Sequence, residues 1–196
     1  TGSTQVGRMV GANAGKTLKK VSLELGGKNS LIILDDADIE RAAENIVWGA
    51  FLHSGQICMT SGKILVQEAI YERLKEKITK KTRQLVVGNP AQENVTIGPL
   101  IDEKQCRRVA DLVQAAVAHG ARLETGGDAQ GVFFRPAVLS GVSKNNPVFH
   151  EEIFGPVAVL IPFADDAEAV ALANDGDYGL SAGIITGNVG RGMQLG

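Results

Sequence analysis

Short apolar segments alternate with longer amphipathic segments along almost the whole of this 196-residue chain. Residues 31–34, 64–66 and 157–163 have the length and composition of buried strands. Between such segments, apolar residues recur at intervals of three and four, as they do on one face of a helix. A chain in which strands and helices take turns is predicted to form an α/β fold, with a parallel or mixed sheet covered by helices.

The clearest helical segment follows Asp38, a residue type that is preferred at helix N-caps. Its apolar stripe consists of Ile39, Ala42, Ala43, Ile46, Val47 and Ala50. Further helices are predicted over residues 6–14, 70–85, 103–119 and 166–173, and a helix is expected to begin near residue 188. Further strands are predicted over residues 21–25, 122–124, 133–139 and 183–186.

Composition narrows the class of protein. The formal net charge is -2, and the basic residues of segment 77–83 share their predicted helix face with Glu72 and Glu76, so nucleic acid is not an expected partner. No apolar run is long enough to cross a bilayer, and no membrane association is expected. Two cysteines do not make a disulfide framework, which favours a cytoplasmic location. The scattered histidines His53, His119 and His150 lack ligand spacing, and no metal site is predicted.

Cys58 lies where the helical pattern after Asp38 breaks into the glycine-containing segment 53–58. A thiolate in a turn can be approached by a substrate, as nucleophilic catalysis requires, and the small residues 60–62 leave room for one. Free cysteine is also a commonly buried residue type, and from Cys58 alone a structural role is favoured. Cys106, by contrast, is in register with the apolar stripe of its own helix and is predicted to be a core residue.

Two acidic positions are further candidates. Glu24 lies in the alternating segment 21–25 before a pair of glycines, and a carboxylate enclosed in a helix-covered sheet can act as a general base. A solvent-facing strand residue fits that pattern equally well. Glu151 and Glu152 precede Phe154 and a Gly–Pro turn, and carboxylates often accept hydrogen bonds from ribose hydroxyls. Taken alone, this segment is better explained as a charged surface turn.

Taken together, these segments resemble those of the aldehyde dehydrogenases. The likeness is carried by residues 1–7, 23–28, 55–58 and 151–156, in the order and approximate spacing of that family, with 178–182 as a further match. Residues 56–60 are most similar to the benzaldehyde and other aromatic-aldehyde dehydrogenases. The resemblance implies that residues 26–196 form most of a catalytic domain with a Rossmann-like three-layer sheet. Residues 1–25 would be the trailing edge of an NAD(P)-binding domain.

The resemblance also implies an activity and two catalytic residues. The reaction would be oxidation of an aromatic aldehyde to a carboxylic acid, with NAD or NADP as cofactor and NAD favoured. Cys58 would add to the aldehyde to form a thiohemiacetal, which becomes a thioester when hydride leaves for the nicotinamide. Glu24 would activate the water that hydrolyses this thioester, and its presence favours hydrolysis over transfer to coenzyme A.

The implied cofactor contacts begin in the first helix. Gly2 and Ser3 would lie near the cofactor pyrophosphate, at a helix N-terminus whose free amides and dipole attract anions. Val6 and Gly7 belong to the same helix, with Val6 against the adenine. This motif differs from the G-x-G-x-x-G fingerprint of other dinucleotide sites.

The nicotinamide end of the cofactor would be held by residues far apart in the sequence. Leu25 would contact the carboxamide through its backbone, Glu152 would accept hydrogen bonds from the ribose hydroxyls, and Phe154 would pack beside them. The partners implied are a small-molecule aldehyde and further copies of the same protein, in a homodimer or homotetramer.

Members of the family are more than twice as long as this chain. The resemblance therefore implies that the 196 residues are a piece of a longer protein, truncated within the catalytic domain and inactive by itself. Two other functions stay open at this point. One is a thioester hydrolase or acyltransferase that uses Cys58 and Glu24 without a nicotinamide, and the other is a non-catalytic relative with a structural role.

Overall fold

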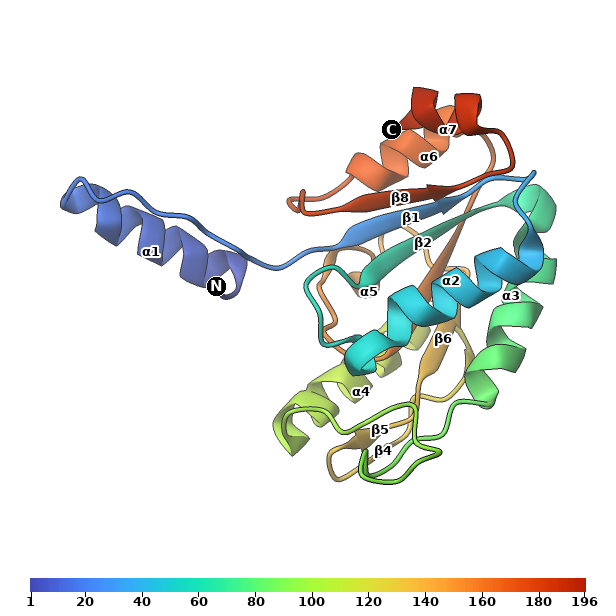
Figure 1. The fold of residues 1–196 in the computed structure, drawn as a ribbon, viewed down its shortest axis with the longest axis horizontal. Coiled ribbons are helices and arrows are strands. Elements are labelled where there is room, and N and C mark those ends of the chain that lie inside the picture. Colours follow the sequence, from blue (N-terminus) through green and yellow to red (C-terminus); the bar gives the residue numbers. More distant parts are fainter.

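A six-stranded sheet forms the centre of the computed structural model, which describes residues 1–196 (Figure 1). The strand order is β3-β6-β7-β2-β1-β8, and all neighbours are parallel except β3 and β6. The six strands are β1 (Asn29–Ile33), β2 (Ser61–Gln67), β3 (Arg122–Thr125), β6 (Ala137–Ser140), β7 (Val157–Phe163) and β8 (Ala182–Ile185). The predicted α/β fold with a mixed sheet is confirmed.

Helices cover both faces of this sheet (Figure 1). The helices are α2 (Ile39–Phe51) and α3 (Glu68–Arg83) on one face, and α4 (Glu103–Ala118), α5 (Pro147–His150), α6 (Asp166–Asn174) and α7 (Val189–Leu195) on the other. Successive strand residues point to opposite faces, so Ile33 packs with α2 and α3 whereas Ile32 and Leu34 pack on the opposite side. Burial on both faces explains why the central strands are continuously apolar.

Side-chain caps determine where the main helices begin. Asp38 accepts hydrogen bonds from the backbone N–H groups of Glu40 and Arg41, which confirms the predicted start of α2. Asp102 and Asp165 cap α4 and α6 in the same way. None of the helices combines the length and hydrophobicity that a membrane-spanning helix requires.

The helix α1 (Thr4–Lys16) stands apart from the rest, joined to β1 by an extended segment (Figure 1). The prediction of a strand over residues 21–25 is wrong, because no other strand of the chain lies beside this segment to form a ladder. Its one backbone contact with the start of the chain is the bond from the Gly2 N–H to the Glu24 carbonyl, at 3.2 Å.

The predicted single strand over residues 133–139 is also wrong. The segment divides into β5 (Phe133–Phe134), which pairs with β4 (Ala129–Gln130), and β6 of the main sheet. Pro136 lies between them, and proline cannot donate to a strand ladder. The chain therefore leaves one sheet and enters the other at this residue.

Candidate active site

Three of the predicted site segments lead directly into three neighbouring strands. Residues 24–28 precede β1, residues 55–58 precede β2, and residues 151–156 precede β7. Because β7, β2 and β1 are adjacent and parallel, the three segments meet at the edge of the sheet where these strands begin. The Gly27 N–H donates to the Glu152 carboxylate at 3.0 Å, which joins the first segment to the third across 125 residues.

A cleft of about 1140 Å³ opens at this edge of the sheet. All but two of the predicted site residues line it, namely Gly2, Ser3, Glu24, Leu25, Cys58, Glu152 and Phe154. The two others, Val6 and Gly7, lie on α1 outside the lining. Val6 is exposed, and Gly7 is buried where a side chain would collide with Leu25.

Cys58 is half-buried, in the turn between α2 and β2. This turn includes three consecutive residues in the left-handed region: His53 at φ 49°, Ser54 at φ 58° and Gly55 at φ 68°. A left-handed conformation is costly for residues other than glycine and persists only where surrounding contacts hold it. At Gly55 a side chain would also collide with the Gly155 carbonyl, so glycine is required there.

Two side chains of this turn hold it against the loop of residues 96–101. The Ser54 hydroxyl donates to the Gly98 carbonyl at 3.0 Å. The Gln56 carboxamide donates to the Pro99 carbonyl at 3.3 Å and accepts from the Ile101 N–H at 2.9 Å. The loop also lines the cleft, and the turn that carries Cys58 therefore has a fixed wall opposite it.

Glu24 lines the same cleft as Cys58, but its side chain is exposed. The sequence argument that a helix-covered sheet encloses it does not hold, because residues 21–25 are not part of a sheet in this chain. Solvent reaches the carboxylate directly. Glu24 and Cys58 thus line one solvent-accessible cleft.

The N-terminus of α1 opens on the cleft through Gly2 and Ser3. Ser3 is the N-cap, and its side chain accepts from the Val6 N–H at 3.4 Å. The first N–H groups of a helix of this length, together with its dipole, suit an anionic group such as a pyrophosphate. Phe154 and Glu152 line the same cleft and add an aromatic ring and a carboxylate to these amides.

The segment that carries Glu152 and Phe154 is held by α4, which the sequence did not indicate. Arg108 donates to the backbone carbonyls of Glu152 and Ile153 at 2.8 and 2.7 Å, and to the Glu151 carboxylate at 2.9 Å. Gln105, one turn earlier, donates to the Phe154 carbonyl at 2.9 Å. Gln105 and Arg108 are three residues apart, so the sequence indicates that they share one face of a helix. Nothing in the sequence indicates that this face packs against residues 151–154.

The hydrogen bonds from Gln105 and Arg108 hold the segment in which Phe154 has a strained backbone conformation. Phe154 has a φ of 54°, in the left-handed region, and 39% of it is exposed to the cleft side of the molecule. A bulky residue keeps that conformation only where its surroundings impose it. The ring is thereby presented at the surface instead of joining the core.

Two buried residues near the site carry titratable groups, one a thiol and the other an ammonium group. Cys106 is fully buried, as predicted from its helical register, and burial raises the pKa of its thiol. Lys28 is also buried, and its ammonium has no hydrogen-bond partner in the chain. Burial, with repulsion from Lys63, lowers the pKa of Lys28 to about 7. The structure contains no group of three or more His, Cys, Asp or Glu side chains placed to hold a metal ion.

The sequence profile of the aldehyde dehydrogenase family matches residues 1–196. The chain is 46% identical over 195 residues to a vanillin dehydrogenase from Amycolatopsis, and 45% identical to an NAD(+) benzaldehyde dehydrogenase from Pseudomonas putida. Each match covers 100% of this chain and 40% of the relative. The chain therefore spans about two fifths of the length of these relatives.

Solved structures show the same likeness in three dimensions. An NADP-dependent enzyme from Escherichia coli superposes with a TM-score of 0.96 at 40% sequence identity. The superposition covers 99% of this chain and 41% of that enzyme. The fold and the order of its elements are thus shared along the chain.

Proposed function

The chain belongs to the aldehyde dehydrogenase family, and we propose that it carries the catalytic thiol and the water-activating carboxylate of an enzyme that oxidises aldehydes to carboxylic acids. The observation that carries this proposal is the shared cleft: Cys58 and Glu24 line it together with the start of α1 and the Glu152–Phe154 segment. Because the chain spans 40% of its relatives' length, the activity is proposed for the complete gene product.

Cys58 acts first in the proposed reaction. Its sulfur adds to the aldehyde carbon as the thiolate, which forms a carbon–sulfur bond and turns the carbonyl oxygen into an oxyanion. The backbone N–H of Cys58 stabilises that oxyanion. When bound in the cleft, the nicotinamide cofactor supplies the acceptor for the hydride that the carbon loses. Cys58 then holds the product as a thioester.

Glu24 acts second. Its carboxylate takes a proton from a water molecule as the water oxygen attacks the thioester carbon, and the carbon–sulfur bond breaks. The Cys58 thiolate leaves, and the carboxylic acid is released. Glu24 passes its proton to solvent, a step that its exposed position in the cleft favours.

Seven residues hold the cofactor in this proposal. The amides at Gly2 and Ser3 bind the pyrophosphate, and α1 presents Val6 to the adenine, while Gly7 lets α1 approach Leu25. At the nicotinamide end, the backbone of Leu25 meets the carboxamide.

Glu152 and Phe154 complete the nicotinamide end. Glu152 accepts hydrogen bonds from the ribose hydroxyls, and the exposed ring of Phe154 packs beside them. We propose NAD in preference to NADP, because the benzaldehyde dehydrogenase relative is an NAD(+) enzyme.

An aromatic aldehyde is the proposed substrate. Two relatives at 45% and 46% identity act on benzaldehyde and vanillin, as their names state. The cleft wall near Cys58 includes the apolar side chains of Leu52, Pro99 and Ile101, which suit a flat ring.

The remaining proposals concern the whole protein. Residues 1–25 are assigned to the edge of an NAD(P)-binding domain and residues 26–196 to the catalytic domain, a division supported by the separation of α1 in Figure 1. A homodimer or homotetramer is proposed from the family. A cytoplasmic location is proposed because Cys58 and Cys106 are both free thiols.

The proposal is tested with benzaldehyde and NAD on the complete gene product and on Cys58→Ala, Glu24→Gln and Cys106→Ala variants. The unmodified protein and Cys106→Ala should form NADH continuously, and Cys58→Ala should form none. Glu24→Gln should form NADH in a single turnover and retain an acyl adduct at Cys58, detectable by mass spectrometry.

The two rival functions give different results. Hydrolysis of a thioester substrate by Cys58 and Glu24, with no NADH formed from any aldehyde, would indicate a hydrolase or acyltransferase. Absence of both NADH and a Cys58 adduct in the unmodified protein would indicate a non-catalytic relative.

A further inference from the structure

Asn29 occupies a central position behind the cleft. It is the first residue of β1, and only 5% of it is exposed. Its side-chain NH₂ donates to the backbone carbonyls of Cys58 at 2.7 Å and Thr60 at 2.9 Å, and its side-chain oxygen accepts from the Ser181 N–H at 3.1 Å. One carboxamide thus joins β1, the turn that carries Cys58, and the segment that leads into β8.

The main-chain ladder cannot hold this turn by itself. Between β1 and β2 the register shifts: Asn29 is paired with Ser61, whereas Ser30 is paired with Lys63, so that Gly62 is an extra residue. Such a bulge interrupts the ladder and redirects the chain. Just before the bulge, the Asn29 side chain supplies the hydrogen bonds that residues 58–60 receive from β1.

The space around these bonds is closed. A side chain at Gly27 would come within 2.6 Å of the Cys58 carbonyl oxygen and within 2.8 Å of the Asn29 side-chain oxygen. The carboxamide and the carbonyl that it binds are therefore packed against backbone, with no room for a second arrangement. Both N–H donors and the oxygen acceptor of Asn29 are used, as a buried amide requires.

We propose that Asn29 is a positioning residue for the nucleophile: by holding the Cys58 carbonyl, it fixes the direction in which the Cys58 thiol faces the cleft. Its effect on catalysis rests on the proposed function, whereas its effect on the thiol does not. No shorter side chain reproduces the set of bonds, because serine offers a single donor where two carbonyls must be bound.

The chain offers a matched control in Asn146. This residue is 1% exposed, its NH₂ donates to the carbonyls of Ala116 at 2.8 Å and His119 at 3.4 Å, and its oxygen accepts from the Val148 N–H at 3.2 Å. It has the same chemistry, burial and kinds of bonds as Asn29, but none of its bonds reaches the turn that carries Cys58. Truncation of either residue removes two side-chain hydrogen bonds to backbone carbonyls.

The experiment compares Asn29→Ala, Asn29→Ser and Asn146→Ala in the complete gene product. Three quantities are measured: the rate of Cys58 alkylation by iodoacetamide, the rate of the first turnover of benzaldehyde with NAD, and the thermal unfolding midpoint. Asn29→Ala should lower both rates by about tenfold, within the range that misplacement of a reacting group costs. Asn29→Ser should fall between Asn29→Ala and the unmodified protein, because one donor is kept.

Asn146→Ala separates positioning from stability. It should lower the unfolding midpoint while both rates stay at those of the unmodified protein. Unchanged rates in the Asn29 variants, or an equal loss in Asn146→Ala, would overturn the proposal. If Asn29→Ala does not fold, the comparison of Asn29→Ser with Asn146→Ala decides in the same way.

The alkylation rate keeps this inference separate from the proposed function. A loss of alkylation in the Asn29 variants supports positioning even if the unmodified protein forms no NADH. Normal alkylation in those variants, with NADH formed by the unmodified protein, would refute positioning and leave the proposed function in place.

Discussion

Lys28 immediately follows the paired glycines before β1 and places a buried ammonium close to the cleft. Its pKa is lowered from 10.5 to about 7 by burial and by repulsion from Lys63, which Glu151 and Glu152 oppose in part. Between pH 7 and about 10, the unfolded chain therefore binds a proton at this position that the folded chain has lost. The free energy of unfolding should rise with pH across that range, and below pH 7 the full cost of the buried charge remains.

Substitution of Lys28 by methionine removes this cost and keeps most of the side-chain volume. We expect Lys28→Met to be more stable than the unmodified chain at pH 7, with an advantage that shrinks by up to about 1.4 kcal/mol per pH unit between pH 7 and 9. Urea unfolding at several pH values measures it. Lys80→Met, at an exposed position of α3, should show no such trend. An advantage independent of pH would contradict the buried-charge explanation.

Gly55 tests the strained turn before Cys58. Alanine there would have to adopt a φ of 68° and would collide with the Gly155 carbonyl. The left-handed conformation alone costs about 1–2 kcal/mol, so Gly55→Ala should lower the free energy of unfolding by at least that amount. Gly179→Ala is the control, since a side chain there meets open space. Equal stabilities of the two variants, measured by chemical denaturation, would show that the turn can relax.

The sequence led to different predictions for the two cysteines because the helical pattern around each one is local. Cys106 shares the period of its own helix, whereas Cys58 lies outside any stripe, and both placements are confirmed by their burial. The roles of Asn29 and Arg108 were not predictable in this way. Their partners lie 29 to 152 residues away, and neither residue belongs to a local pattern that points to them.

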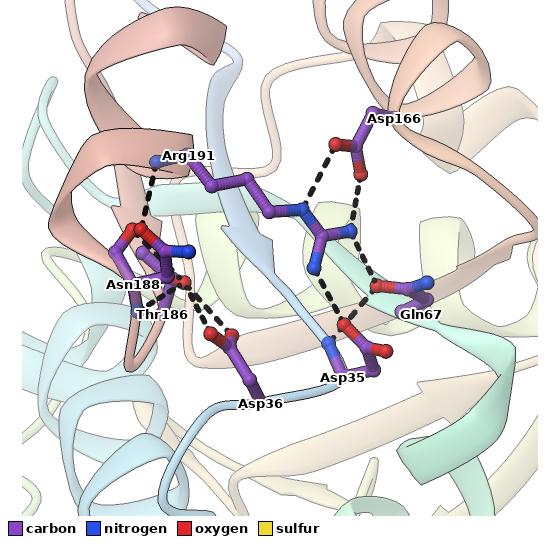
Figure 2. A network of polar contacts seen from close by, with 7 residues as sticks. All are labelled: Asp35, Asp36, Gln67, Asp166, Thr186, Asn188 and Arg191. Atoms are coloured by element: carbon purple, nitrogen blue, oxygen red, sulfur yellow. Dashed lines mark hydrogen bonds and ion pairs between the residues drawn. The ribbon is translucent and has the colours of Figure 1, made fainter.

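At the scale of elements, α7 is held to the sheet by one arginine (Figure 2). Arg191 binds both oxygens of Asp166 at the start of α6, Asp35 after β1, and Gln67 at the end of β2. The Thr186 hydroxyl adds a bond to Asp36 at 2.8 Å. The bond to Arg191 lowers the pKa of Asp166, so that carboxylate stays ionised to lower pH.

Loss of this arginine should loosen α7 locally. In Arg191→Met, we expect hydrogen exchange of residues 189–195 to become faster, because the short helix keeps few other polar contacts with the sheet. Exchange in α2 should be unchanged. Arg107→Met provides the comparison, since Arg107 makes a single exposed pair with Glu103 within α4. If α7 exchanges at the same rate in all three proteins, the arginine does not hold it.

Helices were easier to predict than strands. The Asp38 cap and the 3.6-residue period of its stripe gave α2 at its observed start, since both signals lie within the helix itself. Strands depend on partners: residues 21–25 alternate as a strand does but have no neighbour, and residues 133–139 divide between two sheets. The strands β4 and β5 have two residues each, too few for an alternating pattern to be recognised.

At the scale of the whole molecule, the cleft lies at the edge where β1, β2 and β7 begin. Ligands of open α/β sheets more often bind beyond the ends of the strands, where the Arg191 contacts lie in this chain. The sequence identified the three segments that form the cleft. It could not predict that they meet, because the neighbouring order β7-β2-β1 follows from pairings between distant parts of the chain.

The proposed domain division predicts where a protease cuts first. Lys16 at the end of α1 is exposed, and so are Lys19 and Lys20 in the segment that joins α1 to the rest. Limited trypsin digestion of the 196-residue chain should release α1 at these lysines and leave residues 21–196 resistant, as mass spectrometry would show. Early cleavage within α3 or α4 instead would argue against a separate body for residues 26–196.

A second prediction at this scale concerns activity. Because the chain spans 40% of the length of its relatives, we expect the 196 residues alone to form no NADH from benzaldehyde and NAD, whereas the complete gene product should. Absorbance at the NADH band measures both. Turnover by the 196-residue chain would mean that the cleft is sufficient by itself.

The cleft is formed where the segments that precede β1, β2 and β7 meet, and this has a consequence for biosynthesis. β7 ends at Phe163, and it must pair with β2 before Glu152 and Phe154 can join Cys58. Such distant pairings form late, since long loops must close first. While a ribosome is still extending the polypeptide, the cleft that Cys58 lines is therefore incomplete, and its walls are assembled only after the last of these partners has emerged.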